Sequence, residues 1–276
     1  MSVRIVTDSS CDLPDDLLTE LGIEVVPLSI RFGTTELIDR TELSTDEFWA
    51  RSANSDTLPE TAAPAPGAFE ATFRRLLDGG ASDVVCINLS SGLSATMQSA
   101  QLAASAVDPA RVHVVDSRSA TVGVGLMCVA AARAARDGAS AAAIVAMAND
   151  LAGRTRIWGA LDTLENLKKG GRIGGAKAML ASVLSIKPII QVVDGSVAEG
   201  GKQRTRAKAL AFLIDQVKAA GPLERLAVMH AKCADVDSFV AQLRQVYDGE
   251  IIIGEIGAVI GAHTGAGTIG VVMHVA

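Results

Sequence analysis

The chain has 276 residues, enough for one large domain or two domains of ordinary size. Hydrophobic residues make up 49% and charged residues 20%, which is the composition of a globular protein with a substantial core. The net charge is −6, aromatic residues are only 3%, and no dense run of Lys and Arg occurs, so a nucleic-acid partner is not expected.

The first half of the chain alternates between strand-like and helix-like segments. Apolar runs predict strands at Val3–Thr7, Ile23–Ile30, Val84–Leu89 and Val112–Val115, and helical spacing predicts helices near Phe69–Leu77, Ala95–Ala106, Thr121–Ala135 and Ser140–Leu151. Strands that alternate with helices in this way are typical of a parallel sheet with crossover helices. The first half therefore predicts a parallel-sheet α/β domain.

Short polar clusters follow three of these predicted strands. They are Asp8-Ser9-Ser10, the serine-rich turn Ser90–Ser94, and Asp116-Ser117. Open parallel sheets bind their ligands beyond the carboxyl ends of the strands. We therefore expect a ligand site at this edge of the sheet.

The pattern changes near Ala152–Arg156, where we place a domain boundary. Behind it we expect a strand at Ile157–Leu161, a basic glycine-rich turn, an apolar helix, a strand from Pro188, helices at Lys208–Ala219 and Val236–Tyr247, and strands at Arg225–His230 and Glu250–Ile253. The predicted fold class is α/β with two domains. Residues 1–155 carry the serine-rich loops, and residues 156–276 carry the GGRIGG and GAHTGAG loops.

Ser94 stands where a strand turn opens into a helix. Free backbone N–H groups and the positive end of the helix dipole favour an anion there, and the hydroxyls of Ser90 and Ser91 add donors. A serine in this position is also an ordinary helix N-cap that needs no ligand. From the residues alone both interpretations stay open.

Thr61 and His263 are two further small polar candidates. Thr61 precedes Pro64 and Pro66, which stiffen its loop, and His263 lies among the glycines of GAVIGAHTGAGTIG. A histidine in such a place can donate a hydrogen bond to an anion, and an anion would favour its protonated form. Both residues are equally consistent with plain turn positions. The G-x-G-x-x-G of Gly265–Gly270 is not a dinucleotide-binding fingerprint, because only six residues follow it.

Ser94 also supports a rival interpretation, a serine hydrolase of acyl esters. Gly92-Leu93-Ser94-Ala95-Thr96 nearly matches the G-x-S-x-G nucleophile elbow in a strand-turn-helix setting. The last glycine of that motif is missing. His263 is an obvious partner for Ser94, but no acidic residue stands out as the third member of a triad.

Two basic residues lie in the second half without a recognisable nucleotide motif. Arg172 ends the basic, glycine-rich turn Lys168–Arg172, and Arg204 lies further on. Either residue could face a phosphate or an acidic partner, or could be a solvated charge. Because the chain has no G-x-x-x-x-G-K-[ST] loop and no metal-type spacing of Cys and His, we expect no metal and no cofactor.

Cysteine usage and the distribution of apolar runs bear on cellular location. Cys11, Cys86, Cys128 and Cys233 are isolated, as in reduced cytosolic proteins. The start MSVRIVTDSS lacks the charged region and apolar core of a signal peptide. No apolar run approaches the ~20 residues of a membrane helix. We expect a cytoplasmic protein without stable membrane insertion.

Over essentially its whole length the chain resembles the DegV family of bacterial fatty-acid-binding proteins. The resemblance rests on ordered segments: VRIVTDSSCDLP, PLSI, PETAAPAPGAF, INLSSGLSATMQSA, VVDSRSATVGVG, LENLKKGGRIGGAKAMLASVLSIKPII and GAVIGAHTGAGTIG. It implies two α/β domains that enclose one long-chain fatty acid between them, with the tail in an apolar tunnel. It also implies that Thr61, Ser94 and His263 hold the carboxylate, and we keep Ser90 and Ser91 as secondary head-group candidates.

The same resemblance implies a carrier and not an enzyme. In bacterial fatty acid kinase, a protein of this kind presents its bound acid to a separate, dihydroxyacetone-kinase-like subunit. That subunit phosphorylates the carboxylate with ATP, and the acyl phosphate enters phospholipid metabolism. Arg172 and Arg204 would then face this partner or the transferred phosphate. The expected function is a cytoplasmic lipid-binding carrier whose ligand is a long-chain fatty acid.

Overall fold

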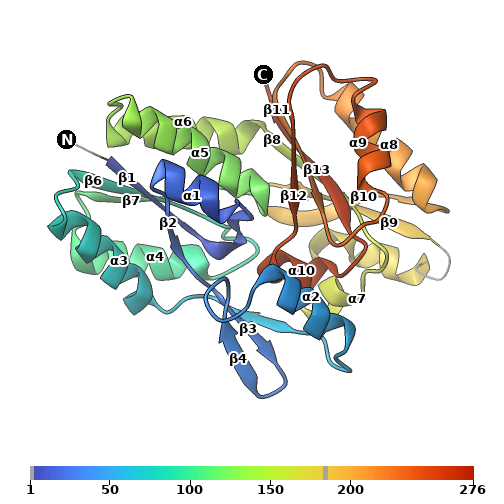
Figure 1. The fold of residues 1–276 in the computed structure, drawn as a ribbon, viewed down its shortest axis with the longest axis horizontal. Coiled ribbons are helices and arrows are strands. Elements are labelled where there is room, and N and C mark those ends of the chain that lie inside the picture. The colour runs from blue at the N-terminus through green and yellow to red at the C-terminus, as the bar shows by residue number, and fades with distance from the viewer. Residues whose placement is uncertain (1–2, 183–185) are drawn as a thin grey trace.

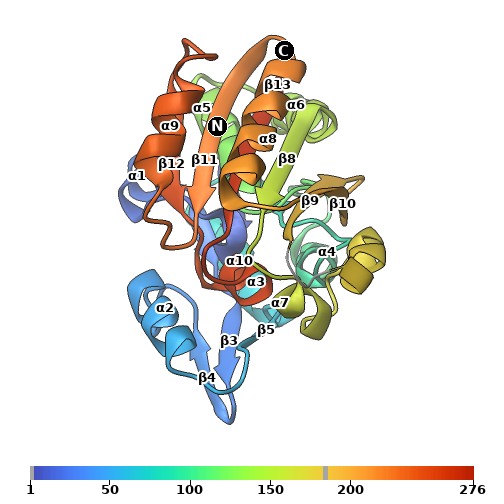
Figure 2. The ribbon, with the colours of Figure 1, turned by 90° about the vertical axis from the view of Figure 1, so that its right-hand side faces the viewer.

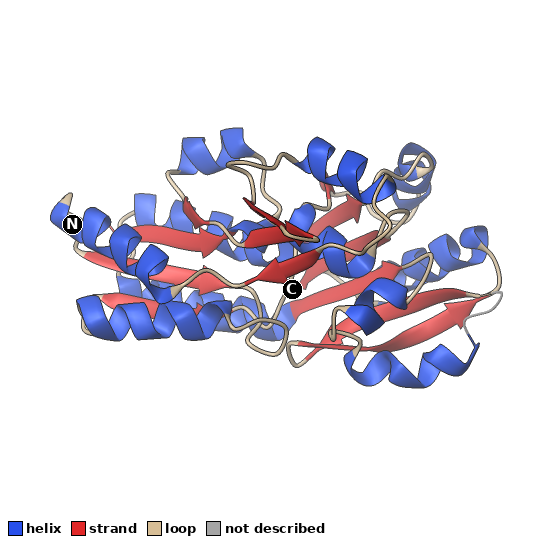
Figure 3. Ribbon diagram, turned by 90° about the horizontal axis from the view of Figure 1, so that it is seen from below, coloured by secondary structure: helices blue, strands red, loops and turns tan. Residues whose placement is uncertain are grey.

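A computed structural model of the chain describes residues 3–182 and 186–276. Its first sheet is parallel and has the order β2-β1-β6-β7, from β1 (Val3–Asp8), β2 (Glu24–Val26), β6 (Asp83–Asn88) and β7 (Val112–Asp116). Helices α3 (Pro66–Asp78) and α4 (Thr96–Val107) cover one face, and α1 (Asp15–Leu21), α5 (Val122–Arg136) and α6 (Ala141–Arg154) lie on the other (Figures 1 and 3). Because both faces are covered, β1 and β6 are buried almost throughout.

Helix α3 shows how the sequence determines these covering elements. Pro66 occupies the first helical position, where its missing N–H group would have had no intrahelical partner. Phe69, Phe73 and Leu76 recur on one face of the helix and are buried against the sheet. The helix ends just before Gly79 and Gly80, and Gly80 has the positive φ of 93° that glycine adopts most easily.

The second sheet has the order β10-β9-β8-β13-β11-β12, and only the β11–β12 pair is parallel. Its strands are β8 (Thr155–Ala160), β9 (Lys187–Val193), β10 (Ser196–Gln203), β11 (Leu223–His230), β12 (Ile251–Glu255) and β13 (Ile269–Val275). Helices α8 (Arg206–Ala219) and α9 (Val236–Leu243) cover one face, and α5 and α6 contact the other. One apolar cluster includes Val85 and Ile87 of the first sheet together with Met229 and Val272 of the second.

A third, small sheet projects as a lobe from the body of the molecule (Figure 2). It is antiparallel in the order β4-β3-β5, from β3 (Ser29–Phe32), β4 (Thr35–Ile38) and β5 (Glu60–Ala62), with α2 (Thr45–Ala53) beside it. The predicted single strand Ile23–Ile30 is therefore wrong. Pro27 has no N–H group to continue the ladder, and the chain leaves the parallel sheet after Val26 and pairs Ile30 with Thr61 of β5.

Short helices connect the remaining strands. They are η1 (Ser9–Cys11), α7 (Glu165–Lys169), η2 (Gly174–Ser182) and α10 (Ala258–Thr264). The apolar helix predicted after GGRIGG is a 3-10 helix as far as the structure describes it, and residues 183–185 of that prediction lie outside the described residues.

Most of the other predicted elements are confirmed to within a few residues, whereas the boundary between two domains near residue 155, where β8 begins, stays a prediction. Among the helices that the structure describes, none has the length and apolar character needed to cross a membrane.

Candidate ligand-binding site

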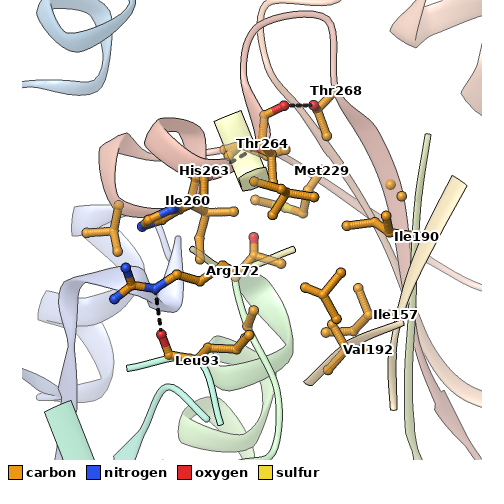
Figure 4. A pocket seen from close by; sticks show the side chains of 18 of the residues that line it. Leu93, Ile157, Arg172, Ile190, Val192, Met229, Ile260, His263, Thr264 and Thr268 are labelled. Atoms are coloured by element: carbon orange, nitrogen blue, oxygen red, sulfur yellow. Dashed lines mark hydrogen bonds between the residues drawn. The ribbon is translucent and has the colours of Figure 1, made fainter. Parts of the chain in front are cut away.

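A cavity lies where the two large sheets, α10 and the serine-rich loop meet (Figure 4). Most of its wall is aliphatic: Leu28, Leu89, Leu93, Ile157, Leu161, Leu167, Ile190, Val192, Val197, Met229, Ile256, Val259, Ile260 and Val272. Because such a wall offers dispersion contacts and excludes water, it suits an extended apolar ligand.

Two threonine hydroxyls of the wall already donate hydrogen bonds to backbone carbonyls four residues earlier in the chain. The hydroxyl of Thr264 donates to the carbonyl of Ile260 at 3.1 Å, and the hydroxyl of Thr268 donates to the carbonyl of Thr264 at 2.9 Å. The other polar groups that matter are Thr61, Ser94, Arg172 and His263, which come from four separate segments.

Thr61 and His263 lie 202 residues apart in sequence and form a direct contact. The Thr61 Oγ1 and His263 Nε2 atoms are 2.9 Å apart. Pairing of β5 with β3 holds Thr61 at the base of the lobe, and His263 lies in the last turn of α10. The predicted turn position of His263 is therefore a helical one, and the predicted loop position of Thr61 is a strand.

The imidazole of His263 is held in its neutral form. Burial, and next the positive charge of Arg172, lower its pKa from 6.5 to about 4. Its Nδ1 atom is buried and has no hydrogen-bond partner among the described residues. A bare acceptor is less costly than a bare N–H donor, so we assign the proton to Nε2. Nε2–H then donates to the Thr61 oxygen, and the Thr61 hydroxyl proton is free for a ligand.

Gly170 at the end of α7 allows this placement of the ring. A Cβ atom at Gly170 would lie 2.3 Å from His263 Nδ1 and 2.9 Å from its Cε1. The imidazole therefore packs directly against the backbone at Gly170, and this contact supports one side of the ring.

Ser94 combines the two interpretations that its sequence position left open. Its Oγ lies 2.8 Å from Thr96 Oγ1 and accepts a hydrogen bond from the Thr96 backbone N–H at 3.3 Å, just where α4 begins. The same side chain lines the cavity. Ser94 therefore orders the start of α4 and also places a hydroxyl on the wall.

Arg172 brings a positive charge to the cavity wall. Its Nε donates to the carbonyl of Leu93 at 3.0 Å, and its Nη1 donates to the carbonyl of Gly170 at 2.7 Å. These bonds fix the half-buried guanidinium beside the segments that carry Ser94 and His263. In Figure 4, Arg172 and His263 lie on one side of the cavity, and Ile157, Ile190 and Val192 lie on the opposite side.

The other predicted site residues lie outside the cavity wall. The Ser90 hydroxyl donates to the carbonyl of Gly195 at 2.7 Å, and the Ser91 hydroxyl donates to Asp116 Oδ2 at 2.5 Å. Arg204 is exposed between β10 and α8. The wall residues on β8 and β9 have no distinctive sequence signal, because apolar residues suit any buried strand.

The hydrolase interpretation finds no support in this geometry. His263 pairs with Thr61 and Ser94 pairs with Thr96, so no described contact joins Ser94 to His263. The Nδ1 atom of His263, which a catalytic acid would bind, has no partner in the described part of the chain. Within residues 3–182 and 186–276, no group of three or more His, Cys, Asp and Glu side chains is placed to hold a metal ion.

Comparisons with known proteins agree over the full length of the chain. A family model described as "Uncharacterised protein, DegV family" matches residues 2–275. A DegV domain-containing protein of Streptomyces coelicolor is 37% identical, and the match covers 98% of each chain. A DegV domain-containing protein of Mycobacterium bovis is 36% identical, over 100% of this chain and 98% of the relative.

Solved structures share the fold. A DegV family protein from Thermus thermophilus, described for its fatty acid binding, has a TM-score of 0.91 at 35% identity, over 100% of each chain. A stearic-acid-binding protein from Eubacterium ventriosum has a TM-score of 0.91 at 27% identity, over 99% of this chain and 98% of that one. DegV of Bacillus subtilis, a fatty acid binding protein, has a TM-score of 0.89 at 29% identity, over 99% of each chain. The predicted α/β, DegV-like fold is confirmed.

Proposed function

The chain belongs to the DegV family, and from this premise we propose that it binds one long-chain fatty acid in the aliphatic cavity. The observation that carries the proposal is the placement of Thr61, Ser94, His263 and Arg172 along a mostly apolar wall. Fatty acid binding by the Thermus thermophilus and Bacillus subtilis proteins of the same fold supports it.

Burial of the tail supplies most of the affinity in this proposal. A sixteen-carbon acid carries about fifteen methylenes, and at ~0.8 kcal/mol each their burial contributes roughly 12 kcal/mol before any cost. Ordering the flexible chain and losing its free motion remove part of that gain. The polar groups are then needed chiefly to set the register of the acid in the cavity.

The head group would be held by two hydroxyls and one guanidinium, and the imidazole of His263 would orient the Thr61 hydroxyl toward it. The Thr61 hydroxyl proton is free to donate, and Ser94 adds a second hydroxyl. Arg172 supplies a fixed positive charge, which favours an ionised carboxylate over the neutral acid. A bound carboxylate would also raise the pKa of His263 from its low value in the ligand-free protein.

We further propose that the bound acid is presented to a separate, dihydroxyacetone-kinase-like subunit, which forms the acyl phosphate with ATP. In that complex Arg172 would lie next to the phosphate being transferred, and the exposed Arg204 would be available to the partner. The protein itself then acts as a carrier and not as an enzyme. We place this carrier in the cytoplasm, as its four free, buried cysteines favour.

Native mass spectrometry of the purified protein tests the proposal. We expect a co-purifying fatty acid at about one per chain, and we expect Ser94→Ala to lower its occupancy without any esterase activity being lost. Absence of a bound acid, and no uptake of added palmitate, would contradict the proposal. Turnover of an acyl ester that disappears in Ser94→Ala would favour a hydrolase instead.

The kinase step has its own assay. The loaded carrier is incubated with the kinase subunit and ATP, and the acyl phosphate is trapped with hydroxylamine as a hydroxamate. We expect His263→Ala to slow trapping. Unchanged trapping and unchanged palmitate affinity in that variant would remove His263 from the head-group site.

A further inference from the structure

Asp12 connects two distant parts of the chain through a single carboxylate. It follows η1 directly and has a positive φ of 48°, which Asp tolerates better than most residues. Its Oδ2 accepts a hydrogen bond from the Thr121 hydroxyl at 2.6 Å, and its Oδ1 accepts one from the backbone N–H of Gly257 at 3.1 Å. Asp12 and Gly257 are 245 residues apart in sequence.

Both partners of Asp12 stand immediately before a helix. Gly257 is the residue immediately before α10, the helix that carries His263. Thr121 is the residue immediately before α5, has a positive φ of 51°, and itself lines the cavity. The Asp12 carboxylate therefore joins the start of α10, which forms part of the cavity wall, to Thr121, which lines the cavity just before α5 begins.

Gly257 is suited to this contact because it has no side chain. A Cβ atom there would lie 2.5 Å from Asp12 Oδ1, so any other residue would push the carboxylate away. The backbone φ of Gly257 is −74°, a value that any residue can adopt. Close approach to Asp12, and not backbone conformation, is thus the reason that the structure gives for glycine at this position.

Ile256, directly before Gly257, forms two other backbone hydrogen bonds. Trp49 Nε1 donates to the carbonyl of Ile256 at 3.1 Å, and the Ile256 N–H donates to the carbonyl of His230 at 2.9 Å. The Gly257 N–H is bound by Asp12. Because α10 has only seven residues, a shift at its first turn is carried along to His263 in its last turn.

We propose that Asp12 is a positioning residue for the head-group site: its hydrogen bonds to Gly257 and Thr121 hold α10 so that His263 meets Thr61. This role rests on the proposed fatty acid binding, because its effect on ligand passes through His263. Asp12 does not line the cavity, so we expect no direct contact with the ligand.

Three variants separate hydrogen bonding from charge and from bulk. Asp12→Ala removes both hydrogen bonds. Asp12→Asn keeps them, because its amide oxygen can accept from Gly257 and its amide group can donate to the Thr121 oxygen. Gly257→Ala keeps the Asp12 side chain but adds a methyl group that displaces its carboxylate. Gly153→Ala, in α6, is the matched control, because no atom lies within 4 Å of the added methyl.

Each variant is compared with wild type by two measurements. Affinity is measured with tritiated palmitate. The imidazole nitrogens of His263 are followed by 15N NMR in the ligand-free protein, where a proton on Nε2 has a distinct shift, and the signal is identified by its loss in His263→Gln. The second measurement reports the position of α10 without any ligand.

We expect Asp12→Ala and Gly257→Ala each to weaken palmitate binding by about tenfold or more, the equivalent of one lost hydrogen bond to a charged group. Both should move the His263 signals, whereas Asp12→Asn should keep the wild-type spectrum and restore affinity to within about threefold. Adding Gly257→Ala to Asp12→Ala should have little further effect, because the methyl group then has room.

The proposal is overturned if Asp12→Ala leaves the His263 spectrum unchanged, if Asp12→Asn is as impaired as Asp12→Ala, or if the two effects add fully in the double variant. Failure of the wild-type protein to bind palmitate would instead overturn the proposed function. In that case the NMR comparison of the ligand-free variants still decides whether Asp12 positions His263.

Discussion

Gly170→Ala is the most direct perturbation of the head-group site that leaves every polar group in place. The added methyl carbon would lie 2.3 Å from His263 Nδ1, which is 0.7 Å inside the 3.0 Å below which real contacts of this kind essentially do not occur. It would also lie 3.0 Å from the backbone oxygen of Asn166, so it cannot retreat in that direction. The φ of Gly170 is −72°, so alanine causes no backbone strain.

The imidazole therefore has to move, and with it the 2.9 Å contact to Thr61. If this contact orients one charge-assisted hydrogen bond to the carboxylate, its loss costs about 1.5–3 kcal/mol of binding free energy. That range corresponds to a roughly ten- to hundredfold higher Kd for palmitate. The free energy of unfolding should fall only through displacement of the ring, because the backbone at Gly170 accepts alanine without strain.

The neighbouring Gly171→Ala is the matched control. Gly171 has a positive φ of 71°, and nothing lies within 4 Å of an added methyl group. It should lower the free energy of unfolding by about 1–2 kcal/mol through backbone strain and leave the Kd for palmitate unchanged. Tritiated palmitate binding and urea unfolding give the two readouts. Equal Kd values for wild type and Gly170→Ala would refute the assignment of His263 to the head-group site.

Two further substitutions test the site and its surroundings. Thr61→Val removes the hydroxyl but keeps the shape and the β-branching that suit β5, so we expect about a tenfold loss of palmitate affinity. The thermal midpoint should also fall, because the His263 N–H loses its acceptor; an unchanged Kd would exclude the hydroxyl as a ligand contact. Burial raises the pKa of Asp12 from 3.8 to about 7, so ionisation of Asp12 costs folding stability, and that cost grows as the pH rises from about 4 to 7. The difference in unfolding free energy between Asp12→Asn and wild type should therefore be more favourable to the variant at pH 8 than at pH 4, by up to about 4 kcal/mol. Parallel pH profiles of the two proteins in urea titrations would contradict this.

The parallel sheet was predictable because its strands are buried on both faces. Val3–Val6 and Val84–Ile87 are mostly apolar, and polar residues mark where each strand ends. By contrast, β10 contains two glycines and a Glu, and it is a strand because it pairs with β9. The turn Asp194-Gly195 between them, with φ values of 48° and 75°, is the hairpin signal that was present in the sequence.

The candidate site was predictable only in part. Thr61, Ser94 and His263 were identified together through the family resemblance, and the structure places all three on one cavity wall. Arg172 was expected to face a partner or phosphate, but which way an arginine points depends on tertiary contacts such as its bond to the Leu93 carbonyl. The role proposed for Asp12 has no local signal, because its partner Gly257 is 245 residues away.

Helix α5 has a consequence for how the chain acquires its structure. Ten of its residues, between Val122 and Ala132, are buried, so this part of the helix is covered by other elements on all of its sides. The first sheet alone covers only part of that surface, and β13 of the second sheet covers another part. A fragment that ended at Arg154 would expose the uncovered part to water. The two large sheets are therefore expected to form and to unfold together, in one cooperative transition. Because folding needs contacts between distant parts of the chain, we expect it to be slow.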